Sequence, residues 1–378
     1  MKLINFQMLT IPDMVLLAIF CVVFIIQIYY LLAIYLKLVL HKKDNFTEAS
    51  IPVSIIVSLR NEEERIRELI ERLTSQEYED YQVIVINEFS EDNTLEILNV
   101  LAETNPRIKI TSLSQETRFL EKQAINLGMK AAKASWIVQL TPNIHTIHPQ
   151  WLANLSGLVD KNTDAVIAYT NIERAKGMRN LIIRLERFNQ FMISGSWLLN
   201  GHPFVFSENN ILFKKSLYFD TLGFRMKVNR NFANLELVFN ENFHNGNVKI
   251  STNPDLAVHE KMDDDRGEHT KLIRKSVQIR QSLSWGIKFG LFMDDLTKIL
   301  LPALATALII IHPEYWITYT SVLIIYYTTL LIIVKKLLNR LKERKIFVSS
   351  FIYILIKPFI NWWVYWSTYI IHRKNKWN

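Results

Sequence analysis

Two runs of polar residues, each directly after a short apolar run, are the part of the sequence best suited to binding a ligand. Residues 60–64 follow the apolar residues 53–57, and residues 87–94 follow the apolar residues 83–86. Apolar runs of this length, rich in β-branched residues, are typical of buried parallel strands. In open α/β sheets, ligands bind beyond the carboxyl ends of the strands. We therefore expect both polar runs to lie at one ligand-binding edge.

The residues between these two runs predict a helix. Four apolar residues recur there at helical spacing: Ile66, Leu69, Ile70 and Leu73. We expect Asn61 to cap the first helical turn, and Glu62 and Glu63 suit the positive end of the helix dipole. Strands at 108–113 and 136–140 and a helix at 119–133 continue the alternation. The predicted fold class is therefore α/β with a mostly parallel sheet.

The composition indicates that part of the chain lies in lipid. Apolar residues make up 49% of the 378 residues, and the mean hydropathy is +0.10; both are high for a purely soluble protein. Much of the excess charge of +8 clusters beside apolar segments, which indicates membrane topology. No aromatic and basic stacking platform for nucleic acid is present, so we expect no nucleic-acid partner. The one cysteine, Cys21, excludes a disulfide within the chain.

An N-terminal membrane anchor is expected within residues 14–40. No charged residue occurs from Met14 to Tyr35, and at ~1.5 Å rise per residue this stretch spans a ~30 Å hydrocarbon layer. A secretory signal peptide is the competing interpretation. It is disfavoured because the apolar part is too long and no small-residue cleavage site follows. The basic flank at 37–43 predicts an integral protein of the cell membrane whose following domain is cytoplasmic.

The C-terminal part is again apolar. Crossings are expected near 296–312 and 315–334, followed by an inside basic segment at 335–345. Residues 346–371 are long enough to span, but Lys357 and Pro358 lie at their middle and basic residues lie at both ends. We expect a re-entrant or interface-lying helix pair there. The predicted divisions are an anchor at 1–43, a cytoplasmic domain at 51–285 and a C-terminal membrane region at 286–378.

Several motifs resemble those of family-2 glycosyltransferases of the membrane-bound type. Residues 58–63 match the Pro-x-x-Asn-Glu end of a first strand except for the proline, and residues 87–94 keep the serine, last aspartate and threonine of Asp-Asp-x-Ser-x-Asp-x-Thr. Residues 207–214 resemble the Gly-x-Asn-x-x-Phe-Arg acceptor strand, and residues 281–285 resemble Gln-x-x-Arg-Trp with serine for arginine. The resemblance implies a Rossmann-like GT-A domain that binds a nucleotide sugar, flanked by transmembrane helices.

The resemblance also implies roles for single residues. Arg60 and Lys122 would meet phosphate, Glu88 would accept a hydrogen bond from a base or ribose hydroxyl, and Asp92 would position its turn. The residues expected on the nucleotide side are Arg60, Asn61, Glu62, Glu88, Asp92 and Lys122. Those expected on the acceptor side are Asn210, Gln281 and Trp285. For Trp285, packing in the core or at a membrane interface is the favoured alternative.

The departures from the family pattern fall on the chemistry. The family holds Mg²⁺ or Mn²⁺ between an Asp-x-Asp carboxylate and the donor diphosphate. Pro142, Asn143 and Ile144 stand at that position here, so the expected metal ligands are missing. The general base is normally the aspartate of a Glu-Asp pair. Ala233 and Asn234 stand there, and neither can accept the proton.

Substitutes for the missing groups are available elsewhere in the chain. Glu236 or Glu241 can serve as a displaced base, although a glutamate on an exposed helix face is usually only solvated. His145 can ligate a softer metal, although a surface turn is the favoured interpretation. The acidic run 263–265 together with Glu260 can recruit a metal, with a solvated loop as the favoured alternative.

Two functions remain open. The first is an integral-membrane glycosyltransferase that moves a sugar from a nucleotide donor to a lipid-linked or polysaccharide acceptor. The second is an inactive scaffold with the same fold, which supports a partner glycosyltransferase or an export subunit. Loss of the metal carboxylates and the base together favours the second function, whereas the fold and topology favour the first. Membrane lipid is an expected partner in both.

Overall fold

The computed structural model describes residues 10–47, 51–116, 119–244, 246–262 and 267–368. The chain forms two compact units. The larger unit is Lys42–Ser282, and the smaller unit combines Met1–His41 with Leu283–Asn378. Each unit is described here by itself.

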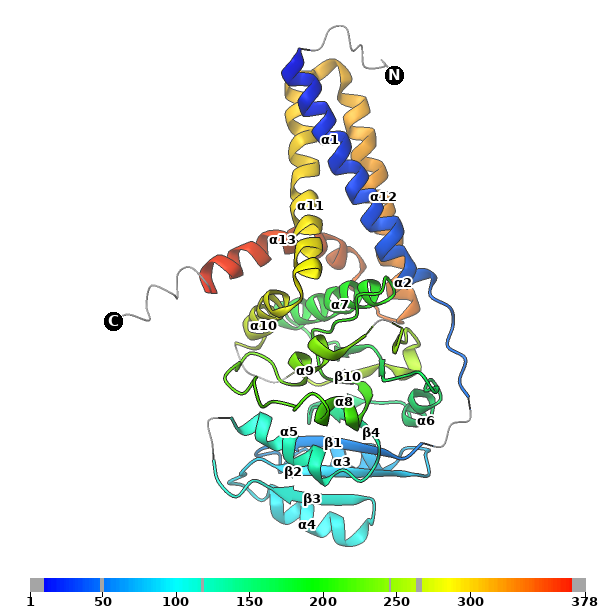
Figure 1. Cartoon of the computed structure of the whole chain (residues 1–378), viewed down its shortest axis with the longest axis vertical. Coiled ribbons are helices and arrows are strands. Elements are labelled where there is room, and N and C mark those ends of the chain that lie inside the picture. Colours follow the sequence, from blue (N-terminus) through cyan, green and yellow to red (C-terminus); the bar gives the residue numbers. More distant parts are fainter. Residues whose placement is uncertain (1–9, 48–50, 117–118, 245, 263–266, 369–378) are drawn as a thin grey trace, which may run out of the picture. The chain divides into compact units, whose positions relative to one another are not determined.

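The larger unit is an α/β domain built on a seven-stranded sheet (Figure 1). The strands in spatial order are β3 (Ile108–Ser112), β2 (Tyr81–Asn87), β1 (Val53–Leu59), β4 (Trp136–Leu140), β8 (Ile211–Lys214), β6 (Ala165–Ile167) and β9 (Val248–Ile250). β8 is antiparallel to β4 and to β6, and the other neighbours pair in parallel. The predicted mostly parallel sheet is confirmed.

The helices of this unit alternate with the strands, as the sequence predicts. They are α3 (Ile66–Thr74), α4 (Thr94–Thr104), α5 (Leu120–Ala131), α6 (Trp151–Ser156), α7 (Met178–Leu198), α8 (Lys215–Phe219), α9 (Leu235–Asn242), the 3₁₀ turn η3 (Pro254–Leu256) and α10 (Glu268–Ser282). A three-stranded sheet is formed by β5 (Ile144–Thr146), β10 (Val258–Glu260) and β7 (Thr170–Ile172).

The alternation of side chains along β1 gives the sheet two covered faces. Ile55 and Val57 belong to a buried cluster with apolar residues of α3 and α6. Ile56 points to the other face, where it meets α5. A Cβ added at Gly128 of α5 would lie 2.8 Å from Cγ2 of Ile56. The glycine therefore permits the close approach of α5 to the sheet.

Residues 165–172 form two short strands that belong to two different sheets. β6 ends at Ile167 and pairs with β8, whereas β7 begins at Thr170 and pairs with β10. The chain leaves the first sheet at Ala168, whose N–H donates to the carbonyl of Asn210 at 3.1 Å. A continuous apolar run cannot reveal this change of partner, because both short strands are buried.

The smaller unit is helical. Its elements are α1 (Ile11–Tyr29), the π-helical turn η2 (Tyr30–Tyr35), α2 (Leu36–Leu40), α11 (Trp285–Ile311), the 3₁₀ turn η4 (Pro313–Tyr315), α12 (Trp316–Arg340) and α13 (Phe347–Trp366). α1, α11 and α12 pack against one another (Figure 1). Three helices of the described chain are long and apolar enough to cross a membrane: Ile11–Leu40, Pro313–Arg340 and Phe347–Trp366.

The crossing expected near 296–312 corresponds to the C-terminal half of α11, a helix that also contains Asp294, Asp295 and Lys298 and is not among these three apolar helices. The helix pair expected over 346–371 is a single helix of 20 residues, α13, as far as the described residues extend. The helix continues through Pro358, and the neighbouring Lys357 is buried with its Nζ 5.8 Å from the Tyr353 ring centroid.

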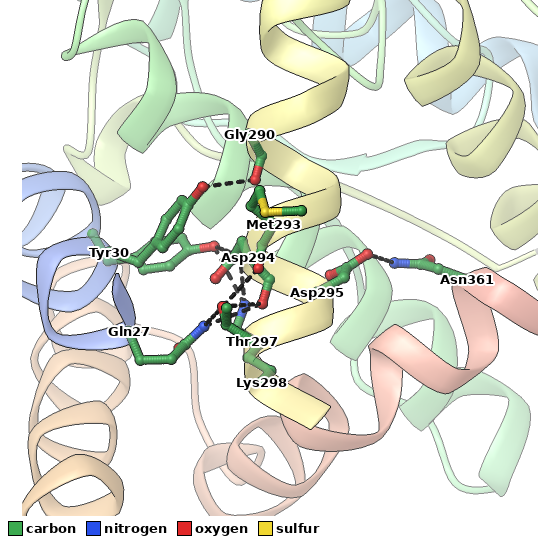
Figure 2. Close-up of polar contacts among 10 residues, drawn as sticks. Gln27, Tyr30, Gly290, Met293, Asp294, Asp295, Thr297, Lys298 and Asn361 are labelled. Carbon is green, nitrogen blue, oxygen red and sulfur yellow. Dashed lines mark hydrogen bonds and ion pairs between the residues drawn. The ribbon is translucent and has the colours of Figure 1, made fainter. Parts of the chain in front are cut away.

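A buried ion pair lies at the centre of the smaller unit (Figure 2). Nζ of Lys298 lies 2.6 Å from Oδ2 of Asp294, one turn earlier in α11, and both side chains are almost fully buried. The hydroxyl of Tyr35 also donates to the Asp294 carboxylate. Such a pair is stable only where each charge has its partner and its hydrogen bonds.

Polar side chains around this pair link three helical segments (Figure 2). Nε2 of Gln27 donates to the carbonyl oxygen of Asp294 at 3.2 Å, and the hydroxyl of Tyr30 donates to the carbonyl oxygen of Gly290 at 2.7 Å. Nδ2 of Asn361 in α13 donates to Oδ2 of Asp295 at 2.9 Å. These bonds fix the register of α1 and α13 on α11.

We predict that Lys298→Met destabilises the helical unit by about 3–5 kcal/mol, because it leaves the Asp294 carboxylate buried without its cation. The measurement is thermal and denaturant unfolding of the full chain in detergent. Lys336→Met is the matched control, since Lys336 is exposed on α12. Equal stability of the two variants would show that the ion pair contributes nothing to the unit.

Candidate functional site

Three polar segments begin at the same edge of the sheet, because β1, β2 and β4 are parallel and in register. Leu59 is opposite Asn87, and Val57 is opposite Leu140. The segments 60–64, 87–94 and 141–145 therefore leave the sheet side by side. This is the edge at which α/β sheets bind ligands.

The turns after β1 and β2 are joined by reciprocal hydrogen bonds. The N–H of Asn61 donates to Oγ of Ser90 at 3.0 Å, and the N–H of Glu91 donates back to Oδ1 of Asn61 at 2.9 Å. The N–H of Glu62 donates to Oγ1 of the buried Thr94 at 2.8 Å. Side-chain oxygens of each turn thus accept hydrogen bonds from backbone N–H groups of the other turn. The two turns therefore form one rigid element.

Asp92 positions its turn, as the resemblance implies. Its Oδ2 accepts from the N–H of Glu63 at 3.2 Å, and its Oδ1 accepts from the N–H of Thr94 at 3.0 Å. Desolvation raises the pKa of Asp92, but the hydrogen bonds from Thr94 and Glu63 outweigh it and hold the pKa below its ordinary value. Asp92 therefore remains a charged acceptor at neutral pH.

The expected capping role of Asn61 is wrong. α3 begins only at Ile66, and the side chain of Asn61 binds the neighbouring turn instead of the helix. Asn61 has a φ of 53°, in the left-handed region, which turns the chain toward Ser90 before the helix starts. Glu62 pairs with Arg65, with Oε2 and Nε 3.0 Å apart.

Arg60 and Glu88 are the charged groups beside these turns. Nη1 of Arg60 lies 2.7 Å from Oε1 of Glu116, and this hydrogen bond raises the pKa of the guanidinium above its ordinary value. Glu88 is 8% exposed, and desolvation raises the pKa of its carboxyl. A partly buried carboxyl with a raised pKa at a ligand-binding edge is a candidate for a functional group.

Lys122 lies apart from the two turns. Its Nζ donates to the carbonyl oxygen of Arg230 at 3.0 Å and to Oδ1 of Asn234 at 3.2 Å. The side chain is buried, and desolvation lowers the pKa of its amine. The structure thus places Lys122 against Asn234, the residue at the position expected for the general base.

Three carboxylates from different elements surround Asn234. Glu121 of α5 accepts from Nδ2 of Asn234 at 2.9 Å, and Glu236 of α9 accepts from its N–H at 2.9 Å. Glu208, which precedes β8, accepts from Nδ2 of Asn234 at 3.4 Å and from the N–H of Leu235 at 2.7 Å. Glu208 was missed by sequence reasoning. The available signal was its place at the glycine position of the acceptor-strand motif.

Glu236 is not on an exposed helix face. Its side chain is fully buried, and Oε1 lies 2.6 Å from Nζ of Lys275 in α10. Glu241 is the exposed glutamate of this helix, and it pairs with Lys227 at 2.9 Å. The enclosed, ion-paired Glu236 is therefore poorly placed to accept a proton from a substrate.

A cavity of about 150 Å³ lies beside the end of β4. Thr141, Glu208, Asn209 and Lys275 line it together with an ion pair, in which Nη2 of Arg187 lies 2.7 Å from Oε2 of Glu260. Asn209 connects the two sides of the cavity. Its Oδ1 accepts from the N–H of Thr141 at 3.2 Å, and its Nδ2 donates to Glu260.

Glu260 is thus a buried, paired residue and not part of a solvated acidic loop. It is 4% exposed on β10. The acidic run 263–265, which was considered with it, lies outside the described residues. Burial of the ion pair holds Glu260 against Arg187 and shapes the polar wall of the cavity.

The residues expected on the acceptor side differ in their burial. Asn210 is fully buried: its Oδ1 accepts from Nε1 of Trp151 at 3.0 Å, and its Nδ2 donates to the carbonyl oxygens of Tyr169 and Leu256. The side-chain amide of Asn210 therefore connects three buried segments of the core. Gln281 is exposed on α10 in the larger unit, whereas Trp285 opens α11 in the smaller unit, 75% exposed and stacked on Phe289.

The residues at the expected metal position do not fit a hard cation. Segment 141–145 offers no carboxylate, and the N–H of Thr141 is bound to Asn209. Within the described parts of the chain, no group of three or more His, Cys, Asp or Glu residues is arranged to hold a metal ion. His145 is exposed, with its Nδ1 3.4 Å from Nη2 of Arg72. Sites for Mg²⁺ and Mn²⁺ are usually built on carboxylate oxygens, and this window has none.

Comparison with known sequences shows that part of the larger unit is similar to glycosyltransferases. Residues 54–224 match the family model described as Glycosyl transferase family 2. An uncharacterized glycosyltransferase of Haemophilus influenzae is 30% identical over 110 residues, 29% of this chain and 33% of that protein. The glycosyltransferase GlyG of Streptococcus pneumoniae is 24% identical over 183 residues, 44% of this chain and 58% of that protein. This chain thus spans between a third and somewhat over half of these relatives.

Comparison with solved structures supports the fold. The mannosyltransferase PcManGT from Pyrobaculum calidifontis, in complex with GDP-Man and Mn²⁺, is similar over 90% of this chain and 99% of that chain, with a TM-score of 0.54 and 18% identity. At this identity the likeness shows the fold alone. It confirms the expected GT-A architecture.

We predict that Thr94→Val destabilises the chain by about 1–3 kcal/mol, because it removes the hydroxyl that accepts the N–H of Glu62 while keeping the side-chain volume. The measurement is denaturant unfolding of the purified protein. Thr104→Val is the control, since Thr104 is exposed on α4 and its hydroxyl bonds only within that helix. If Thr94→Val unfolds like Thr104→Val, the coupling of the two turns is not important for stability.

Proposed function

We propose that this chain transfers a sugar from a nucleotide-sugar donor to a lipid-linked or polysaccharide acceptor, because residues 54–224 match the family model of the family-2 glycosyltransferases. One observation carries the proposal. The turns after β1 and β2 are locked together by reciprocal hydrogen bonds at the carboxyl edge of the sheet. A rigid edge of this kind is what a nucleotide-binding site requires.

The charged residues at this edge suit a nucleoside diphosphate. Arg60 is a permanently charged guanidinium that can form paired hydrogen bonds to phosphate. Glu88 offers a carboxyl to the base or the ribose hydroxyls. The structural neighbour that binds GDP-Man supports a nucleoside diphosphate sugar as the donor class. The cavity beside Thr141 is the space proposed for the transferred sugar.

The apolar helices support an acceptor that is reached from a membrane. Three helices of the described chain are long and apolar enough to cross a bilayer. We propose that they anchor the protein in the cell membrane with the larger unit in the cytoplasm, as the basic flank at 37–43 predicts. A lipid-linked acceptor would then present its hydroxyl close to the anchored enzyme.

A second candidate function is an inactive partner subunit with the same fold. It is favoured by the side chain of Asn234, which stands at the base position and hydrogen-bonds Glu121, Glu208 and Lys122. Loss of a general base alone typically lowers a rate by roughly 10²- to 10⁴-fold. Such a subunit would bind a nucleotide or a glycan for a partner glycosyltransferase or export protein.

Nucleotide binding tests the proposal directly. UDP and GDP are titrated calorimetrically into the full chain in detergent, with Mn²⁺ and again with EDTA. Binding in either condition supports the nucleotide site, and its dependence on Mn²⁺ shows whether a metal contributes. No binding under any condition would contradict the enzyme, and co-purification would then identify the partner of a scaffold.

We predict that Arg60→Ala weakens nucleotide binding by roughly tenfold to hundredfold, because a charge-assisted hydrogen bond to phosphate contributes about 1.5–3 kcal/mol. The measurement is the same titration. Arg67→Ala is the matched control, since Arg67 is exposed on α3 and lies away from the turns. An equal affinity of the two variants would remove Arg60 from the phosphate site.

A further inference from the structure

We infer that Glu208 is the general base of this site and replaces the carboxylate that the chain lacks at position 234. The inference rests on the proposed glycosyltransferase function. It names the residue that takes the proton of the acceptor hydroxyl.

The sheet places Glu208 beside the end of β4. β8 runs antiparallel to β4, with Ile211 opposite Gln139. Residues that precede β8 therefore lie next to residues that follow β4. Glu208 and Thr141 accordingly line the same cavity of about 150 Å³. A carboxylate on this wall faces the space proposed for the sugar.

The contacts of Glu208 bring its carboxylate to the position where the base is missing. Its Oε2 accepts from the N–H of Leu235 at 2.7 Å, and its Oε1 lies 3.4 Å from Nδ2 of Asn234. Glu208 itself stands where the acceptor-strand motif has glycine. Glu208 thus supplies a carboxylate beside Asn234, the position at which the family has its general base.

The neighbouring carboxylates are engaged elsewhere. Glu236 is fully buried and ion-paired with Lys275 at 2.6 Å. Glu260 is ion-paired with Arg187 at 2.7 Å. Neither Glu121 nor Glu241 is among the residues that line the cavity. Of the two carboxylates that line the cavity, Glu260 forms an ion pair, whereas Glu208 is held by hydrogen bonds among the described residues and keeps one weakly bound oxygen.

The charges around Glu208 suit proton transfer near neutral pH. Desolvation is the main cause that raises its pKa to about 7, and repulsion by Glu236 adds to it. Lys275 opposes this effect and stays protonated, because attraction by Glu236 outweighs desolvation and raises its pKa. The charged groups that face Glu208 from the surrounding elements and the cavity wall are Glu121, Lys122, Arg187, Glu236, Glu260 and Lys275. A base is most effective when its pKa lies near the working pH.

The proposed step is a direct displacement. The acceptor oxygen forms a bond to the anomeric carbon of the donor sugar as the bond from that carbon to the diphosphate oxygen breaks. The acceptor proton passes to the Glu208 carboxylate, and the bonding electron pair leaves with the nucleoside diphosphate. A single displacement inverts the anomeric configuration. The protonated Glu208 then releases its proton to water.

Glu208→Gln tests this role without removing a hydrogen-bond acceptor, since the amide oxygen of glutamine can still accept from Leu235. The assay uses the full chain in detergent with a panel of UDP- and GDP-sugars, and follows both transfer to a membrane lipid extract and hydrolysis by water. We predict that kcat falls roughly 10²- to 10⁴-fold while nucleotide affinity stays within about twofold. Glu241→Gln is the matched control, because Glu241 is an exposed glutamate that is not among the residues lining the cavity.

The pH profile separates a base from a structural residue. A base must be ionised to act, so the kcat of the natural protein should rise as the pH passes about 7. Glu208→Gln should lose this rise, and Glu208→Ala should recover activity when formate is added. Retention of the rise in Glu208→Gln, or activity within about fivefold of the natural protein, would overturn the role of Glu208.

Failure of the inference and failure of the proposed function give different results. A natural protein that binds UDP or GDP but neither transfers nor hydrolyses any donor between about pH 5 and about pH 9 contradicts the base and supports the inactive partner. A natural protein that binds neither nucleotide contradicts the proposed function, and the inference with it.

Discussion

The parallel pairing of β1 with β2 and β4 is the interaction on which the site depends. It aligns Leu59 with Asn87 and Val57 with Leu140, so that three polar segments leave the sheet at one edge. Antiparallel β8 then brings the segment before it to the same edge. The turns after β1 and β2, the cavity and Glu208 thus lie at one edge because of strand direction. Sequence separation does not determine which residues meet: Glu208 and Asn234 are 26 positions apart and their side chains are in contact.

Buried charges are the second constraint on the structure, because each needs a partner of opposite charge. Both units contain such buried ion pairs. Asp294 pairs with Lys298 in the helical unit, and Glu236 pairs with Lys275 in the α/β unit. Burial of an ion costs several kcal/mol unless the geometry and the additional hydrogen bonds compensate. The paired carboxylates are therefore fixed parts of the structure. Among the described residues, ion-paired carboxylates such as Asp294 and Glu236 stabilise the fold. Glu208 differs from them because its raised pKa allows it to change protonation near neutral pH.

Local pattern in the sequence predicted the elements but not their partners. The period of Ile66, Leu69, Ile70 and Leu73 identified α3, and the apolar run 83–86 identified β2, since periodicity depends only on neighbours in the chain. The first turn of α3 was misplaced because Asn61 bonds to a segment 30 residues away. The environment of Glu236 was also missed, because its partner Lys275 belongs to another helix. Long-range contacts carry no local signal, so the candidate site could be predicted only at the level of the sheet edge.

The position of Glu208 distinguishes the two proposed functions better than the missing residues do. An inactive subunit gains nothing from a carboxyl whose pKa is raised by burial, because the charge costs free energy on folding whenever it is ionised. The N–H of Leu235 needs only an acceptor, and a neutral side chain would satisfy it without that cost. Under the proposed function, proton transfer gives a reason for a glutamate at this position in addition to its hydrogen bond from the N–H of Leu235. This argument favours turnover, even though the residues of segment 141–145 have lost the carboxylates of the family.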